Sequence, residues 1–182
     1  MRLITISGLP GSGTSTLSRM LAAHTGWTYL NTGAVFRQLA QEAGVTLPEF
    51  GRRAEADADI DRQLDARMLQ LADAAEVGCV LEGRLMGWMA HRHQLPALKV
   101  WLDATPTTRV GRVASRDGQD LLRAEVEIEE RERSERLRYL LHHDIDLADT
   151  SIYDLILDSA QAPPAELQAQ ALTALADLEP SP

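Results

Sequence analysis

The sequence SGLPGSGTST occupies residues 7–16 and follows a short β-branched run, RLITI, at residues 2–6. A helical pattern, STLSRMLAAHTG, begins at its end and covers residues 15–26. Glycines allow such a strand-to-helix turn to aim its backbone N–H groups inward, and the helix start adds the positive end of a dipole. The stretch therefore predicts a phosphate cradle built on Gly8, Gly11 and Gly13.

The cradle departs from the pattern G-x-x-x-x-G-K-[ST] at one position, because Thr14 stands where the lysine is expected. Ser15 keeps the hydroxyl that binds Mg²⁺ in such loops. A threonine hydroxyl donates one hydrogen bond and carries no charge to stabilise transferring phosphates. The loop alone leaves three interpretations open: a turn with no ligand, a nucleotide binder without catalysis, and an enzyme whose positive charge comes from elsewhere.

Composition limits where that charge can come from. Among 182 residues there are 17 arginines and a single lysine, Lys99, so arginine must make almost every phosphate contact. The net charge of −9 argues against a general nucleic-acid or anionic-membrane surface. The one cysteine, Cys79, lies in an apolar run and is expected to be a buried thiol. With no long apolar segment and no signal-like start, we expect a cytoplasmic monomer that binds neither nucleic acid nor membranes.

Short apolar runs alternate with helical patterns along the whole chain. Strands are expected at 2–6, 27–30, 79–82, 98–104 and 152–158, and helices at 15–26, 32–44, 47–56, 57–78, 84–94, 106–118, 120–143 and 163–178, with a frayed tail at 179–182. This alternation predicts an α/β fold with a mostly parallel sheet of about five strands, flanked by helices, in a single domain over residues 1–182.

Ligands of such sheets bind outside the carboxyl ends of the strands. Four of these ends carry chemically informative residues: the phosphate loop, Asn31-Thr32-Gly33, Glu82-Gly83-Arg84 and Asp103. Glu82 closes a buried strand and is placed to orient Mg²⁺ near Ser15, or to pair with Arg84, or both.

The motifs together resemble those of the nucleoside monophosphate kinases, and specifically the short cytidylate kinases typical of archaea, which also phosphorylate dCMP. The resemblance is carried, in order over about residues 1–158, by ITISGLPGSGTST, NTGAVFRQLA, LPEFGRRAEADADID, VLEGRLMGWMA, ERERSERLRY and DIDLADTSIYDLIL. Members of this family are also known with threonine in place of the loop lysine, which favours an active enzyme. The resemblance implies a three-layer P-loop NTPase fold, with a helical acceptor-binding segment at about 32–76 and a lid at about 109–143.

It also implies roles for residues that match the family's motifs. ATP would be held by Gly8, Pro10, Gly11, Ser12, Gly13, Thr14, Ser15, Thr16, Arg112 and Arg116, and Mg²⁺ by Ser15 and Glu82. The acceptor, CMP or dCMP, would be held by Thr32, Gly33, Arg37, Phe50, Asp61, Gly83, Arg84 and Glu135. The catalytic arginines would be Arg37, Arg84, Arg131 and Arg138, whose forked donors suit phosphate.

Helical spacing places Arg131, Glu135 and Arg138 on one face, which predicts two arginines around one carboxylate. Asp61 is either an acceptor for a cytosine amino group or an N-cap or solvated acid. The neighbouring histidines at 142 and 143 are expected in a surface turn rather than at a metal. Arg123, Arg133 and Arg136 are expected on an exposed helix with ion pairs four residues apart.

Two other functions stay open on sequence grounds. One is a kinase of another, possibly modified, nucleoside monophosphate or small substrate. The other is a non-catalytic nucleotide-binding protein, as the absent loop lysine suggests.

Overall fold

A computed structural model describes residues 2–178 of the chain, and the tail at 179–182 lies outside this range. The strands are β1 (Leu3–Ser7), β2 (Thr28–Asn31), β3 (Cys79–Glu82), β4 (Ala97–Asp103) and β5 (Leu155–Asp158). The helices are α1 (Thr14–Thr25), α2 (Thr32–Glu42), α3 (Leu47–Ala56), α4 (Ala58–Asp73), α5 (Met86–Arg92), α6 (Pro106–Asp117), α7 (Leu121–His143) and α8 (Pro164–Leu178).

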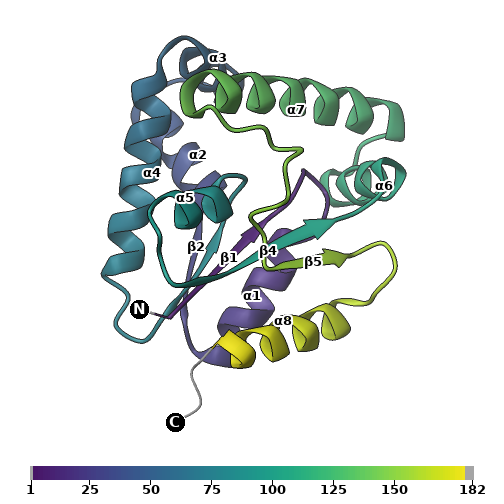
Figure 1. Cartoon of the computed structure of the whole chain (residues 1–182). Helices are drawn as coiled ribbons and strands as arrows, with labels where there is room; N and C mark the ends of the chain where they lie inside the picture. The colour runs from purple at the N-terminus through teal and green to yellow at the C-terminus, as the bar shows by residue number, and fades with distance from the viewer. Residues whose placement is uncertain (1, 179–182) are drawn as a thin grey trace.

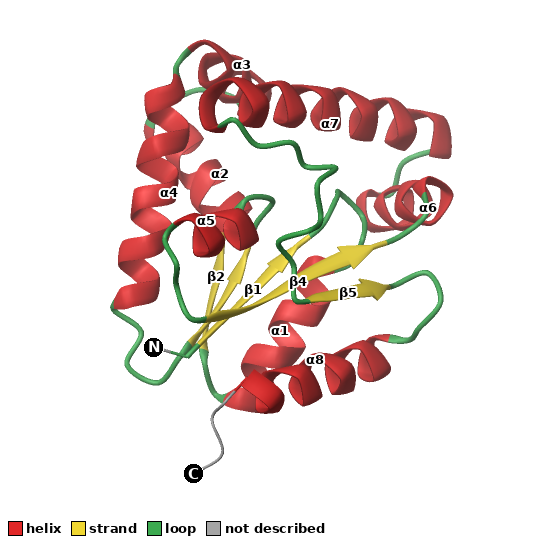
Figure 2. Cartoon of the chain, viewed as in Figure 1, coloured by secondary structure: helices red, strands yellow, loops and turns green. Residues whose placement is uncertain are grey.

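The five strands form one parallel sheet in the order β2-β3-β1-β4-β5 (Figure 2). In its centre, Ile4 of β1 lies opposite Val80 of β3 on one side and Leu98 of β4 on the other. Parallel strands need long crossovers, and helices supply them on both faces. The predicted α/β fold is therefore confirmed.

Two apolar cores lie on opposite faces of this sheet because strand side chains alternate between faces. Ile4 and Ile6 pack with Leu17 and Leu21 of α1 and with Leu167 of α8. On the other face, a second set of buried side chains joins the sheet to α4, α5 and α7; it includes Leu3, Met68, Cys79, Leu81, Met86, Met89 and Tyr139. Figure 1 shows α1 and α8 below the sheet and the other helices above it. The expectation of a buried cysteine is confirmed.

Element boundaries differ from the predicted ones by a few residues. The helix expected over 57–78 ends at Asp73. The chain then turns through Gly78, where a Cβ would lie only 2.6 Å from the ring of Trp27. This close approach fixes the entry into β3, so the helix cannot continue to the strand.

The carboxyl ends of β1, β3 and β4 point toward the side of the sheet that α7 crosses (Figure 2). The predicted site residues therefore gather in the space between the sheet, α2, α6 and α7. Within residues 2–178, no helix is both long enough and apolar enough to cross a membrane.

Candidate active site

The phosphate loop joins β1 to α1 and is packed too closely for side chains at two of its glycines. A Cβ on Gly8 would lie 2.5 Å from the carbonyl oxygen of Leu102, and one on Gly11 would lie 2.5 Å from that of Arg109. Gly11 also has a φ of 83° and Gly13 a φ of 96°, a region that favours glycine. The glycines thus allow the loop to fit against the ends of β4 and α6.

The loop presents free donors at the start of α1. Gly13 precedes the helix and supplies no side-chain cap. Within residues 2–178, the backbone N–H groups of Gly13, Thr14 and Ser15 donate to no protein acceptor, so they are available to phosphate oxygens. The structure brings together all the loop residues expected at ATP, namely Gly8, Pro10, Gly11, Ser12, Gly13, Thr14, Ser15 and Thr16.

Four donors converge on the carboxylate of Glu82 at the end of β3. Its Oε1 accepts from the Thr14 hydroxyl at 2.7 Å and from the Ser15 hydroxyl at 2.6 Å. Its Oε2 accepts from the Tyr29 hydroxyl and the Asn31 amide. Burial, together with the hydrogen bond to Glu82, raises the pKa of Tyr29 to about 12, so this phenol remains a donor at neutral pH.

Glu82 is 6% exposed, and within residues 2–178 it has no hydrogen-bonded or ion-paired cation. A buried carboxylate without a counter-charge is costly. The Ser15 hydroxyl and the Glu82 carboxylate are both oxygen donors of the kind that Mg²⁺ binds. The residues present therefore fit a magnesium ion, and they give Thr14 a role as a neutral hydrogen-bond partner of the same carboxylate.

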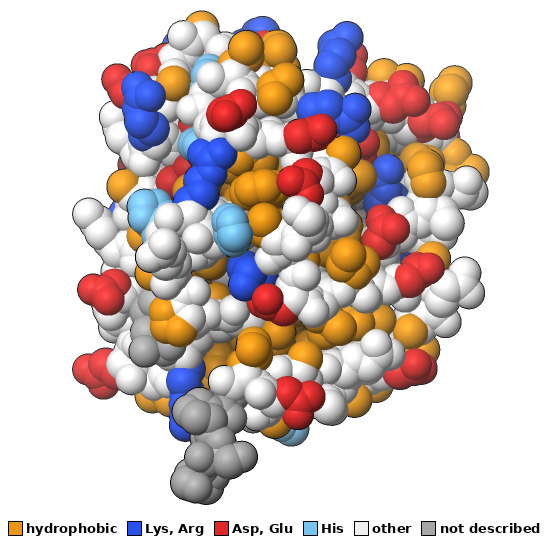
Figure 3. All heavy atoms as spheres, in the orientation of Figure 1, with side chains coloured by type: hydrophobic (Ala, Val, Ile, Leu, Met, Phe, Trp, Pro, Cys, Tyr) orange, Lys and Arg blue, Asp and Glu red, His pale blue; other side chains and the backbone are white. Residues whose placement is uncertain are grey.

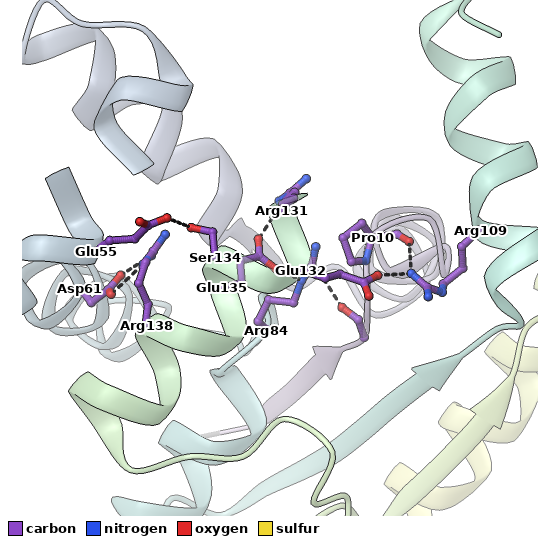
Figure 4. A network of polar contacts seen from close by, with 11 residues as sticks. Pro10, Glu55, Asp61, Arg84, Arg109, Arg131, Glu132, Ser134, Glu135 and Arg138 are labelled. Carbon is purple, nitrogen blue, oxygen red and sulfur yellow. Dashed lines mark hydrogen bonds and ion pairs between the residues drawn. The ribbon is translucent and has the colours of Figure 1, made fainter. Parts of the chain in front are cut away.

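The expected pairing of Glu82 with Arg84 is absent from the structure, because Arg84 bonds to the phosphate loop and to α7 instead. Its Nη1 donates to the carbonyl oxygen of Gly8 at 2.7 Å, and its Nε donates to Oε2 of Glu135 at 2.8 Å. Oε1 of Glu135 accepts from Nε of Arg131, also at 2.8 Å (Figure 4). Burial opposes ionisation of Glu135, but the charges of Arg84 and Arg131 outweigh it and hold the pKa of this carboxyl at about 2.

Arg138 does not share Glu135, contrary to the prediction. Its Nε donates to Oδ2 of Asp61 at 3.1 Å, and its guanidinium lies 5.1 Å from the ring centre of Phe36. Phe36 in turn packs edge-on against Phe50, with 4.9 Å between ring centres. The alternative that Asp61 is an N-cap or a solvated acid is wrong, since it is buried in an ion pair and Asp57 caps α4, whereas its role as an acceptor for a cytosine amino group stays a prediction.

The histidines at the end of α7 are buried and do not lie in a surface turn. Nδ1 of His142 lies 3.3 Å from Oδ2 of Asp61, and Nε2 of His143 lies 3.7 Å from Oδ2 of Asp65. Burial lowers the pKa of His143. Burial, reinforced by the charge of Asp61, raises the pKa of Asp65 to about 7. Within residues 2–178, no three His, Cys, Asp or Glu side chains gather in a way that could hold a metal ion.

The residues expected at the acceptor surround a small cavity. Its volume is about 20 Å³, and its walls include Thr32, Asp61, Arg84 and Tyr139. A Cβ on Gly83 would lie 2.2 Å from the Thr32 hydroxyl, which donates to the Glu82 carbonyl oxygen at 2.9 Å. The cavity holds about one water, whereas a ligand of nucleotide size needs roughly 300 Å³ or more. The cavity as it stands has no room for a nucleotide.

The other residues expected at the acceptor, among them Arg37 and Gly33, do not line this cavity. Arg37 is exposed and, within residues 2–178, forms no hydrogen bond or ion pair, so its guanidinium is free. It lies beside Gly33, because Nη1 of Arg37 would be 3.5 Å from a Cβ on that glycine. Both belong to the first turns of α2, whose N-cap Asn31 accepts from the N–H of Ala34 at 2.7 Å.

Three arginines contact the phosphate loop through its carbonyl oxygens. Besides Arg84, these are Arg109, which donates to Pro10 at 3.2 Å, and Arg112, which donates to Ser12 at 3.2 Å. Arg112 also donates to the Ser159 hydroxyl at 2.8 Å. Arg116, the other arginine expected at the donor, pairs with its neighbour Asp117 and is exposed, so the structure does not bring it to the loop.

Sequence reasoning missed Tyr29 and Ser159, and it noted Asn31 at a strand end without assigning it a role. The hydroxyl of Ser159 donates to the Ser12 carbonyl oxygen at 2.7 Å. Ser159 lies just beyond a strand end, so the rule that pointed to Glu82 could have found it. Tyr29 gave no such signal, because it reads as an ordinary strand residue.

Comparison with known proteins places the chain among the kinases. A family model described as "Cytidylate kinase-like family" matches residues 3–161. The cytidylate kinase of Thermococcus kodakarensis is 46% identical over 179 residues, which are 98% of this chain and 90% of that protein. The cytidylate kinase of Methanococcoides burtonii is 47% identical over 159 residues, or 87% of this chain and 88% of that protein.

Solved structures share the fold at low sequence identity. Shikimate kinase from Acinetobacter baumannii in complex with shikimate has a TM-score of 0.63 at 16% identity, covering 98% of this chain and 95% of that one. A gluconokinase from Sinorhizobium meliloti has a TM-score of 0.59 at 20% identity, covering 96% and 91%. At such identities the likeness shows the P-loop kinase fold alone.

Proposed function

This chain belongs to the cytidylate kinase-like family, and we propose that it transfers the γ-phosphoryl group of ATP to CMP or dCMP. A phosphate oxygen of the acceptor attacks the γ-phosphorus, and the bond to the bridging oxygen of the β-phosphate breaks. The products are ADP and CDP or dCDP. The observation that carries the proposal is Glu82, a buried carboxylate without a cationic partner in residues 2–178, 2.6 Å from the Ser15 hydroxyl of a phosphate loop.

The donor side of this mechanism relies on backbone and oxygen groups. The N–H groups of Gly13, Thr14 and Ser15 hold the β-phosphate at the start of α1. Ser15 and Glu82 would hold Mg²⁺, which would supply positive charge to the phosphates. Tyr29 and Asn31 fix Oε2 of Glu82, so that Oε1 stays turned toward Ser15.

The acceptor side relies on arginines. Arg84 reaches from the end of β3 to the loop carbonyl of Gly8, which supports a role for its guanidinium in binding phosphate beside the loop. Arg37 is free to bind the acceptor phosphate as α2 closes on it. Arg131 and Arg138 contribute further charge once phosphate oxygens compete with Glu135 and Asp61 for them. These guanidiniums take the place of the loop lysine.

The proposal is tested by ADP release in a coupled assay, with Mg²⁺ and a panel of acceptors. The panel holds CMP, dCMP, UMP, AMP and GMP, with shikimate and gluconate as small substrates of structurally similar kinases. We expect the highest kcat/KM for CMP or dCMP. ATP binding without turnover of any acceptor would identify a non-catalytic binder, and turnover of a non-cytosine acceptor alone would overturn the choice of substrate.

A further inference from the structure

The outward face of α7 carries large exposed apolar side chains toward both of its ends and charged side chains in between. Five large apolar side chains are between 47% and 71% exposed there: Leu122, Val126, Leu137, Leu140 and Leu141. At 100° per residue they fall on one side of the helix, opposite the buried Ala124, Ile128, Glu135 and Tyr139 that face the protein. Apolar atoms among charged ones along the upper margin of Figure 3 belong to this region. A stripe of about 28 Å, from 19 steps of 1.5 Å, is thus left without a partner in residues 2–178.

The same face carries charges that are also unpaired. Glu130, Arg133 and Arg136 are exposed and, within residues 2–178, form none of the ion pairs that the sequence led us to expect on this helix. A groove of about 380 Å³ lies between side chains of α7, and its walls are Leu137, Leu140 and four charged residues, Glu129, Glu132, Arg133 and Arg136. Such a groove can accept side chains of a second helix.

The second helix can be α7 of another copy of this chain. When two copies of α7 are placed side by side in opposite directions, the residues of the stripe match each other. In an antiparallel pair of α7 helices centred between residues 131 and 132, each residue faces a residue of the other copy, and the two residue numbers add up to 263. Leu122 then faces Leu141 and Val126 faces Leu137. The same register sets Glu130 against Arg133, so that apolar side chains meet toward the ends of the contact and opposite charges meet near its centre.

We propose that a second copy of this chain covers the outward face of α7, forming a two-fold symmetric dimer through an antiparallel α7–α7 contact. A two-fold axis repeats each pair on both sides, which is the isologous arrangement of most homodimers. A single pair of helices buries less area than a standard interface, so the association is weak and depends on protein concentration. This proposal, which goes beyond the phosphoryl transfer above, replaces the expectation of a monomer.

Sedimentation velocity of the full chain, from about 1 to about 300 µM, tests the proposal over the range expected for a weak interface. We expect the mass to rise from 20.0 kDa toward about twice that value. Leu137→Glu should weaken association at least tenfold, because it places two carboxylates in the apolar contact. Leu121→Glu is the matched control: it removes an equally exposed leucine of the same helix, at a position outside the stripe, and should leave association unchanged.

Charge reversal tests the register. Glu130→Arg and Arg133→Glu should each weaken association, because each sets like charges against each other across the axis. The two changes in one chain should restore it, because the pair is exchanged on both sides. Circular dichroism checks the fold, and Val126→Ser replaces Leu137→Glu if the latter does not fold.

A mass of 20.0 kDa at all concentrations, or a dimer that survives Leu137→Glu, would overturn the proposal. Failure of the double reversal to restore association would overturn the antiparallel register. Sedimentation with vesicles of phosphatidylcholine and phosphatidylglycerol, lost in Leu137→Glu while the free protein stays monomeric, would assign the stripe to a lipid surface instead.

Discussion

Replacing Glu82 with glutamine removes one charge from the centre of the donor site and almost nothing else. The side chain keeps its size, and the structure dictates how the new amide must lie. Asn31 cannot turn its amide around, because its Oδ1 accepts from the N–H of Ala34 as the cap of α2. The glutamine oxygen must therefore take the Oε2 position, and its NH₂ group must face the hydroxyls of Thr14 and Ser15.

The expected effect on stability is small. Hydroxyls rotate, so those of Thr14 and Ser15 can accept from the new NH₂ group, and all the partners remain bonded. The charge-assisted hydrogen bonds become neutral ones, but a buried carboxylate without a cationic partner in residues 2–178 also disappears. These contributions oppose each other, and we expect the free energy of unfolding to change by no more than about 1 kcal/mol.

The expected effect on catalysis is large. An NH₂ group cannot bind a metal ion, and Ser15 loses the acceptor that orients its hydroxyl. We expect kcat/KM for CMP to fall at least about 10²-fold, with the Mg²⁺ concentration for half-maximal rate at least about tenfold higher. The matched control is Tyr29→Phe, which removes one donor to Oε2 but keeps the charge, and should cost less than about tenfold.

The assay is coupled ADP release at fixed ATP and CMP, titrated with Mg²⁺, alongside urea unfolding followed by circular dichroism. If Glu82→Gln kept kcat/KM within about threefold of the wild type and left the Mg²⁺ midpoint unchanged, the carboxylate would have no part in metal binding. Its four hydrogen bonds would then serve packing alone.

Three further changes probe other parts of the site. Arg84→Ala should lower kcat/KM at least about 10²-fold. Arg84→Lys should keep only part of the activity, since lysine lacks the two parallel N–H donors of a guanidinium. An unchanged rate in Arg84→Ala would show that Arg84 binds no phosphate. Thr14→Lys should raise kcat/KM by less than about threefold or lower it, because its ammonium would pair with Glu82; a gain above about tenfold would show that the native loop lacks a charge it needs. Asp65→Asn tests the raised pKa of about 7. The folded protein binds that proton more tightly than the unfolded chain, so Asp65 favours folding at low pH, and this contribution is lost as pH rises through about 7. Relative to the wild type, the variant should therefore gain about 2 kcal/mol in urea unfolding between pH 5 and pH 8, and a constant difference would contradict the shift.

Local patterns predicted the elements and the phosphate loop because local geometry determines them. The alternation of apolar runs gave all five strands within three residues at either end, and the glycine spacing gave the turn before α1. The rule that ligands gather at strand ends also found Glu82 and Arg84. These features depend on residues that are neighbours in the sequence and on the right-handed connection of parallel strands. Both can be inferred from a single sequence.

Partner choice within the site could not be predicted in the same way. Helical spacing correctly placed Arg131, Glu135 and Arg138 on the inner side of α7, but it could not say which carboxylate each arginine reaches. Arg138 contacts Asp61 because α4 passes beside the end of α7, 77 residues away in the chain. That contact depends on how α4 and α7 pack against each other. The spacing of residues within one helix does not show which residues of another helix it meets.

The threonine in the phosphate loop connects these observations. A lysine at position 14 would be drawn to Glu82, since that carboxylate is buried beside the loop and accepts from Thr14. With threonine there, Glu82 keeps its charge for a metal ion, and the positive groups stand around the loop instead of inside it. Arg84 and Arg112 bond to loop carbonyls, so they are held in place before any phosphate binds. The absence of the loop lysine therefore leaves Glu82 without a cationic partner in residues 2–178. A variant with lysine at position 14 should give Glu82 such a partner and disturb its binding of a metal ion.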